Sequence, residues 1–148
     1  MTITILTHDP RWKGLRPTVE RAVAAALAQQ KIIRAAVTVV LADDAEIQAL
    51  NKQYRGKNKP TNVLSFPDGS VDGGVRQLGD IVMAYETLAR EAVAQGKPLK
   101  RHLTHLAVHG TLHLLGFDHE VEAEAEAMEA CEIKILARMG IANPYESA

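Results

Sequence analysis

The sequence predicts an α+β fold in which a mixed sheet of about four strands carries packed helices. In the first half of the chain, short β-branched segments either alternate polar and apolar residues or are continuously apolar. In the second half, apolar residues recur at helical spacing instead. The chain has 148 residues, which suits a single domain spanning 1–148. We therefore expect one core, with most strands early and most helices late.

The predicted strands are Thr2–Thr7, 35–41, 61–66 and 79–85. The first alternates polar and apolar residues, as a half-buried strand does. The second is a continuous apolar, β-branched run typical of a buried strand. Pro67 ends the third, because proline cannot donate a ladder hydrogen bond. A turn rich in Gly and Asp, at 68–74, separates the third strand from the fourth.

The predicted helices are 12–29, 43–54, 87–95, 99–115 and 120–139. Trp12 is expected to anchor the start of the first helix in the core. Asp43 or Asp44 caps the second, since a carboxylate accepts hydrogen bonds from the free N–H groups of a first turn. Gly96 and Gly140 close the third and the last, as glycines commonly do after a helix.

The last predicted helix is acidic on one side and apolar on another. Its apolar stripe consists of Val121, Ala125, Met128, Cys131, Ile135 and Met139. We interpret the acidic residues between Asp118 and Glu132 as a solvated face. Because Cys131 falls on the apolar stripe, we expect it to pack rather than to act as a nucleophile.

Composition limits the classes of protein that the chain can be. A single cysteine excludes an internal disulfide and suits a reducing cytosol. The formal net charge of −1 gives no global signature of nucleic-acid binding, so a polyanion would need a local basic patch. Residues 1–9 lack the basic start of a signal peptide, and no segment approaches the roughly 18 apolar residues of a membrane helix. We expect a cytoplasmic protein without a membrane segment.

Three histidines form the most informative pattern in the chain. His109 and His113 lie four residues apart, on one face of the predicted helix. Gly116 allows a left-handed turn that can bring His119 back toward the same point. Three imidazoles with an open fourth position are typical of a catalytic zinc site. The pattern predicts one Zn²⁺ ion at the end of the helix, although nickel, copper or cobalt also suit such ligands.

Other interpretations of the histidines are weaker. The spacing matches the metzincin protease signature, but Gly110 stands where those proteases carry their glutamate base. A closed structural site normally uses cysteines, and Cys131 lies on another predicted helix. His105 and His113 are about 12 Å apart along a helix, too far to share an ion. We therefore expect His102 and His105 to face solvent or substrate, or to support the ligands.

A basic segment precedes the third strand. It contains Lys52, Arg55, Lys57 and Lys59 without an acidic residue. Alone it would be interpreted as a solvated loop, but a three-histidine metal site attracts anions. Arg55, at the junction of helix and loop, can bind a phosphodiester through two parallel hydrogen bonds. We expect the three lysines to attract an RNA backbone more diffusely.

Three segments, 50–67, 78–82 and 109–119, resemble the YbeY family of bacterial endoribonucleases. Two departures are mild: Phe117 stands where tyrosine is frequent, and Asn62 where aspartate is frequent. The resemblance implies a metal-dependent, single-strand-specific endoribonuclease that matures the 3′ end of 16S rRNA and takes part in ribosome quality control. It implies His109, His113 and His119 as zinc ligands and Arg55 as the essential residue beside the phosphate. It also implies ribosomal small-subunit proteins and an assembly GTPase as partners.

Two chemistries fit these residues, attack on phosphorus by water or by the RNA 2′-hydroxyl. Arg55 and His109 are the expected catalytic residues in either case. Asp118 is expected to orient a ligand histidine, with fourth ligand or proton carrier as alternatives. Two other functions remain open: a non-catalytic ribosome assembly factor with a structural metal, and another metal hydrolase that acts on peptides or small phosphoesters.

Overall fold

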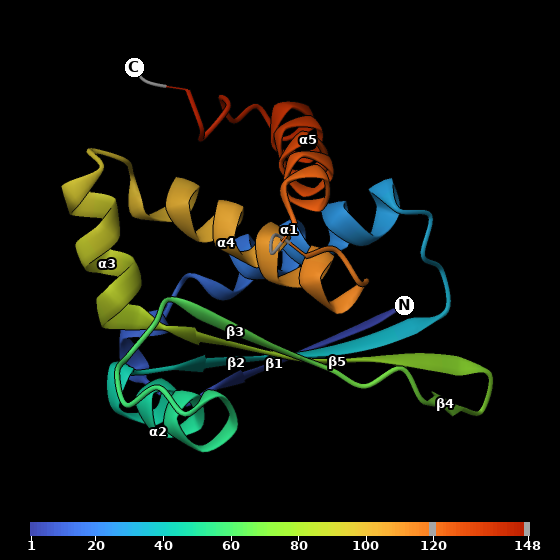
Figure 1. The fold of residues 1–148 in the computed structure, drawn as a ribbon, viewed down its shortest axis with the longest axis horizontal. Coiled ribbons are helices and arrows are strands. Elements are labelled where there is room, and N and C mark those ends of the chain that lie inside the picture. The colour runs from blue at the N-terminus through green and yellow to red at the C-terminus, as the bar shows by residue number, and fades with distance from the viewer. Residues whose placement is uncertain (119–120, 147–148) are drawn as a thin grey trace.

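The computed structural model describes residues 1–118 and 121–146 and has the predicted α+β architecture, with a mixed sheet as its platform (Figure 1). Its strands are β1 (Thr2–Thr7), β2 (Ala35–Ala42), β3 (Val63–Pro67), β4 (Val71–Asp72) and β5 (Val75–Ala84). Four of them lie in the order β1-β2-β5-β3, and β4 pairs with β5. The neighbours β1, β2 and β5 run parallel, whereas β3 and β4 run antiparallel to β5.

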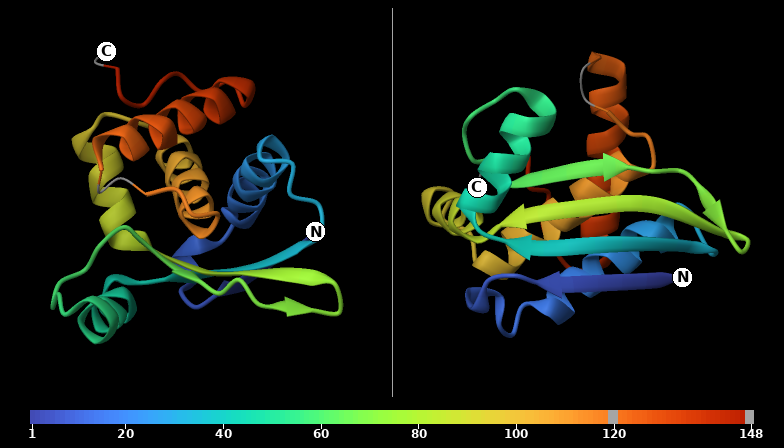
Figure 2. Two further views of the ribbon diagram at one scale, coloured as in Figure 1. Left: turned by 45° about the vertical axis from the view of Figure 1, so that its right-hand side comes forward. Right: turned by 90° about the horizontal axis from the view of Figure 1, so that it is seen from below.

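Helices cover both faces of this sheet. They are α1 (Arg16–Gln29), α2 (Asp44–Arg55), α3 (Tyr85–Ala94), α4 (Leu99–Leu114) and α5 (Glu122–Arg138), with a 3₁₀ turn, η1, at Pro10–Trp12. One face carries α1, α3 and α4, and α5 lies on the outer side of α1 and α4 (Figure 1). The opposite face carries α2 (Figure 2). Within the described part of the chain, no helix is long and apolar enough to cross a membrane.

The alternation of side chains along the strands divides the core between the two faces. Val37, Val39 and Leu41 of β2 join the larger core under α1 and α4. Ala42, at the end of the same strand, lies in a smaller cluster with Ile47 of α2. A continuously apolar strand is what a sheet covered on both faces requires, so the prediction of a buried strand at 35–41 is confirmed.

The largest differences from the predicted boundaries are at the starts of β5 and α1. The turn expected at 68–74 contains the short strand β4, which pairs with the beginning of β5. This pairing makes a hairpin, so β5 begins at Val75 rather than at 79. The first helix begins at Arg16, after the 3₁₀ turn that contains Trp12. Trp12 is nevertheless the expected core anchor: it is buried, and its indole Nε1 donates to the carbonyl of Ala42 at 2.8 Å.

Helix α4 lies close to the sheet at Gly110. A Cβ atom added there would lie 3.1 Å from Cγ2 of Ile81 and 3.3 Å from Cγ2 of Val63. The hydroxyl of Ser65, on β3, donates to the carbonyl of Gly110 at 3.0 Å. The residue in the position of the protease glutamate therefore faces the sheet, and there is little room for a side chain at this position.

The N-termini of α2 and α3 are joined by reciprocal hydrogen bonds. The carboxylate of Asp44 accepts from the backbone N–H of Thr87 at 3.1 Å, from its hydroxyl at 2.7 Å and from Arg90 at 2.8 Å. Glu86, on α3, accepts in return from the backbone N–H of Asp44 at 3.0 Å. Each carboxylate thus satisfies a free donor at the start of the other helix, which fixes the direction of α2.

The space at Gly110 leads to a first prediction. Gly110→Glu, which restores the protease residue, should lower the free energy of unfolding by about 3 kcal/mol or more, because it overpacks the helix–sheet contact and buries a charge. Thermal and urea denaturation measure the loss. Ala130→Glu, on the exposed side of α5, is the matched control and should leave stability nearly unchanged. Equal stability of the two variants would contradict the close approach.

Asp44 leads to a second prediction. Partial burial raises the pKa of Asp44, but hydrogen bonds from Thr87 and Arg90 outweigh it and hold this pKa below its ordinary value of 3.8. A carboxyl whose pKa is lower in the folded state stabilises the protein above the unfolded-state pKa, and this contribution is lost as the pH falls through the folded-state pKa. Asp44→Asn should therefore flatten the acid side of the stability profile below pH 4.

Denaturation at a series of acidic pH values measures this profile. The control is Asp72→Asn, at an exposed position in β4, which should retain the slope of the original protein. If Asp44→Asn kept the same slope below pH 4, Asp44 would not carry the proposed contribution.

Candidate active site

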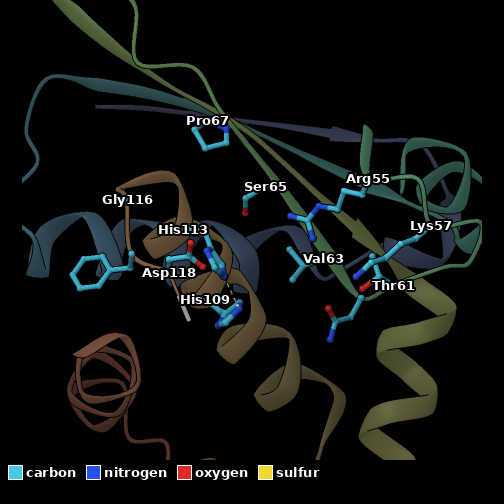
Figure 3. Close-up of a pocket in the computed structure, with 12 residues that line it drawn as sticks. Arg55, Lys57, Thr61, Val63, Ser65, Pro67, His109, His113, Gly116 and Asp118 are labelled. Atoms are coloured by element: carbon cyan, nitrogen blue, oxygen red, sulfur yellow. Dashed lines mark hydrogen bonds between the residues drawn. The ribbon is translucent and has the colours of Figure 1, made fainter. Parts of the chain in front are cut away.

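A cavity of about 890 Å³ opens beside the C-terminal half of α4 (Figure 3). One wall is α4 with the turn that follows it, another is β3, and a third comes from the end of α2 and the next loop. The residues that line it are Arg55, Lys57, Thr61, Asn62, Val63, Ser65, Pro67, His109, His113, Gly116, Phe117 and Asp118. The structure therefore gathers residues from the basic segment and from the histidine motif, which are about fifty positions apart in the sequence, around one space.

His109 and His113 point into this cavity from one face of α4 (Figure 3). Their Nε2 atoms are 3.1 Å apart. Two nitrogens bound to one tetrahedral ion at 2.0–2.1 Å would be separated by about 3.3 Å. The pair is thus spaced as two ligands of a zinc-type ion would be, which is the arrangement expected from their separation by one helical turn.

Gly116 ends α4 in the left-handed conformation that the sequence predicts, with φ of +99°. The N–H of Gly116 donates to the carbonyl of His113 at 3.1 Å, and that of Phe117 donates to Leu112 at 3.1 Å. These two hydrogen bonds form a Schellman motif. The turn redirects the chain so that Phe117 and Asp118 line the cavity. The third predicted ligand, His119, lies outside the described residues.

The donor set within the described residues is incomplete. Among residues 1–118 and 121–146, no group of three or more His, Cys, Asp or Glu side chains is placed to hold an ion. The histidine pair fits an imidazole-bound transition metal, because its two Nε2 atoms lie 3.1 Å apart and imidazole nitrogens are donors that such metals prefer. Asp118 lines the same cavity, and its expected role beside a ligand histidine stays a prediction.

Arg55 reaches the cavity because of the way α2 ends. Gly56 adopts a left-handed conformation with φ of +69° and closes the helix directly after Arg55. The buried amide of Asn51 donates to the carbonyl of Lys59 at 2.9 Å, which ties the following loop back to the helix. Figure 3 shows Arg55 and Lys57 on the side of the cavity opposite the histidine helix.

The four predicted basic residues are thus divided. Arg55 and Lys57 line the cavity, whereas Lys52 and Lys59 do not belong to its described lining. Both of the latter are exposed. The structure therefore places two of the four basic residues in the same cavity as the histidines and leaves the other two on the surface.

Asn62 has a specific reason to be an amide in this chain. Its Nδ2 donates to both carboxylate oxygens of Glu91, at 3.1 and 3.2 Å. The same carboxylate is 2.9 Å from Nε2 of His102. An ionised aspartate at position 62 would have no proton to donate and would face Glu91 as a like charge. The departure from the frequent aspartate therefore suits the neighbour that this chain carries.

Glu132, on α5, is the residue that the sequence analysis missed. It is fully buried, and it accepts a hydrogen bond from Nδ1 of His109, on the side of the ring away from His113. Burial raises the pKa of Glu132, but hydrogen bonds from His105, His109 and Tyr145 outweigh burial and lower this pKa to about 2. Glu132 is therefore an acceptor at neutral pH and leaves Nε2 of His109 as the ring's lone-pair donor.

The interpretation of a wholly solvated acidic face on the last helix is therefore wrong at this residue. Glu132 lies four residues after Met128 and three and four before Ile135 and Leu136, all of which are buried. That spacing puts Glu132 on the same helical face, so the signal was present in the sequence. Cys131 was expected to pack, and it is partly buried against the core.

The two remaining histidines of α4 lie outside the cavity lining. His102 is buried and bonds to Glu91, as described above. The Nε2 atom of His105 is 3.5 Å from Oε2 of Glu132, so His105 lies behind His109 and supports Glu132. Of the alternatives left open for His105, the structure selects a supporting position.

The cavity combines two chemical properties. Arg55 and Lys57 favour an anion, and the paired imidazole nitrogens offer lone pairs to a metal. Gly110, by contrast, faces the sheet, so the position that supplies the base in metzincin proteases does not belong to the cavity lining. The arrangement suits a phosphate-containing substrate better than a peptide.

Comparisons with known proteins agree with this geometry. A family model described as endoribonuclease YbeY matches residues 5–140. The endoribonuclease YbeY of Azorhizobium caulinodans is 48% identical, with 98% of this chain and 96% of that protein covered. That of a Chelativorans species is 54% identical, with 95% of this chain and 90% of that protein covered.

The fold also matches a solved structure. The solution structure of TM1509 from Thermotoga maritima aligns with a TM-score of 0.56 at 25% sequence identity, over 98% of this chain and 99% of that one. The similarity in fold therefore extends over nearly the whole length of both chains. The chain belongs to the endoribonuclease YbeY family.

Proposed function

We propose that this chain, acting as one domain over 1–148, is an endoribonuclease that cleaves phosphodiester bonds of single-stranded RNA with the help of one bound Zn²⁺ ion. The observation that carries the proposal is that one cavity contains the paired Nε2 atoms of His109 and His113 together with Arg55 and Lys57. Family membership supports the reaction class, because the matched relatives are named endoribonucleases.

His109, His113 and His119 would hold the ion. When bound, a zinc-type ion supplies Lewis-acid stabilisation of phosphate charge and lowers the pKa of water toward neutrality. Neutral imidazoles bring no negative charge to offset the ion, so an anionic substrate is attracted to the cavity. Other transition metals that accept imidazole ligands would occupy the same position.

Arg55 is the residue proposed to bind the scissile phosphate. Its guanidinium can donate two parallel hydrogen bonds to phosphate oxygens and neutralise the charge that develops there. A pre-aligned donor of this kind is worth about 3 kcal/mol in the transition state. Lys57 adds positive charge at the cavity, and Lys52 and Lys59 attract the RNA backbone from the nearby surface. Asp118, at the same cavity, is the carboxylate proposed to orient a ligand histidine or move a proton.

Single-stranded RNA suits the shape of this site. The cavity lies between α4 and β3, so an RNA strand must bend to bring one of its phosphates to the histidines. A flexible strand can do this, whereas an A-form duplex holds its phosphates on a stiff helix. Aromatic residues make up 4% of the chain, which leaves few platforms for base stacking and favours recognition of the backbone.

In the cell, we propose that the substrate is ribosomal RNA, at the 3′ end of the 16S species, in maturation and ribosome quality control. Ribosomal small-subunit proteins and an assembly GTPase are the proposed partners, and the cytoplasm is the proposed location. The resemblance of three sequence segments to the family supports these assignments.

Cleavage of a labelled single-stranded RNA tests the proposed function. Zinc-loaded protein should cut it, and EDTA treatment should abolish the cut. His113→Ala should lose activity with the metal, and Arg55→Ala should reduce kcat/KM by at least about a hundredfold. Arg55→Lys should recover little, because an ammonium cannot form the two parallel hydrogen bonds. Lys31→Ala, at an exposed position near the end of α1, is the control for loss of a positive charge.

The products distinguish the two chemistries. Attack by the 2′-hydroxyl leaves a cyclic phosphate and cannot occur on an all-deoxy substrate, whereas attack by water leaves a linear phosphate. Equal cleavage by all variants would contradict the site. Absence of cleavage by every form, together with binding of ribosomal particles, would favour the non-catalytic assembly factor.

A further inference from the structure

The C-terminal segment after α5, residues 139–146, folds back along α4 and reaches the rear of the histidine pair. The ammonium of Lys97 donates to the carbonyl of Pro144 at 3.4 Å. The ring of Tyr145 meets His105 edge to face, with centroids 5.5 Å apart and planes at 87°. Tyr145 lies beyond residue 140, where the match to the family model ends.

The hydroxyl of Tyr145 donates to Oε2 of Glu132. The other oxygen of that carboxylate, Oε1, accepts from Nδ1 of His109. His105 lies beside the hydrogen bond between Tyr145 and Glu132, because its Nε2 atom is 3.3 Å from the hydroxyl oxygen of Tyr145. The tail, α5 and α4 are therefore connected through one fully buried carboxylate.

A buried carboxylate needs partners on both oxygens. An ionised group without them would be strongly destabilised by the loss of water. Tyr145 provides such a partner for Oε2 and restricts the rotation of the Glu132 side chain. With Glu132 fixed, the Nδ1–H tautomer of His109 is favoured and its Nε2 lone pair faces the cavity.

We propose that Tyr145 is a positioning residue of the metal centre: its hydroxyl holds Glu132, and Glu132 holds the ring of His109 in the orientation and tautomer that bind the ion. The part of this inference that concerns the ion rests on the proposed function. The part that concerns the tautomer of His109 does not.

The ionisation of Tyr145 supports the direction of its hydrogen bond to Glu132. Burial and the neighbouring carboxylate of Glu132 raise the pKa of Tyr145 above its ordinary value. The phenol therefore keeps its proton at neutral pH and remains a donor.

Zinc affinity of the full chain, measured by competition with a chelator, tests the inference. We expect Tyr145→Phe to weaken zinc binding about tenfold and Glu132→Gln to weaken it 10- to 100-fold, the range typical of groups that support a metal ligand. Tyr54→Phe, at an exposed tyrosine, and Glu126→Gln, at an exposed position of α5, are the matched controls and should bind as the original protein does.

The double variant separates positioning from general structural support. If Tyr145 acts through Glu132, Tyr145→Phe adds little once Glu132→Gln is present, so the two effects are strongly non-additive. Independent structural effects would multiply instead. Zinc binding by Tyr145→Phe within twofold of the original, or full additivity in the double variant, would overturn the proposal.

Histidine ¹⁵N NMR of the metal-free protein provides a second readout. We expect His109 to show the Nδ1–H tautomer in the original protein and in Tyr54→Phe, and a mixture of tautomers in Tyr145→Phe. An unchanged His109 spectrum in Tyr145→Phe would overturn the inference. If His113→Ala and the original protein bound zinc equally, the proposed metal centre would be wrong. The tautomer of His109 in Tyr145→Phe would still show whether Tyr145 acts on His109 through Glu132.

Discussion

The close contact between α4 and the sheet at Gly110 is the constraint on which the rest of the site depends. Ser65 donates to the Gly110 carbonyl, and a side chain at position 110 would meet Val63 and Ile81. His109 and His113 both line the cavity, from the part of α4 that makes this contact. A larger residue at 110 would meet the side chains of Val63, Ser65 and Ile81.

The charged groups on the two sides of the histidines differ. The cavity side carries Arg55 and Lys57, where an anionic substrate would bind, together with Asp118. The buried side carries the carboxylate of Glu132, whose charge is held by hydrogen bonds from His109 and Tyr145. This separation lets a negative group orient the imidazole without repelling a phosphate, because the carboxylate is fully buried and does not line the cavity. The strand β3 thus forms a wall of the cavity, and α5 contributes the carboxylate that contacts His109.

Sequence reasoning went furthest where local rules decide the structure. The spacing of His109 and His113 and the left-handed turn at Gly116 both follow from helix geometry, and both are present. It failed where a contact joins distant segments: β4 depends on pairing across a hairpin, and the contacts of Glu132 with His109 and Tyr145 depend on how α5 packs on α4. Tyr145 gave no periodic signal, because it lies in a tail outside any helix or strand. Arg55 could be singled out from the sequence by its place at the junction of helix and loop, but only the fold separates Lys57 from Lys52 and Lys59.

Anomalous diffraction at the zinc absorption edge from crystals of the zinc-loaded protein would show whether His109 and His113 hold one ion. We expect one strong peak in the cavity about 2.0–2.1 Å from Nε2 of both histidines. We expect the imidazole of His119 as the third ligand. Arg55 should face the same ion from the opposite side of the cavity. A peak at Cys131, or no peak between the two histidines, would contradict a metal centre on α4.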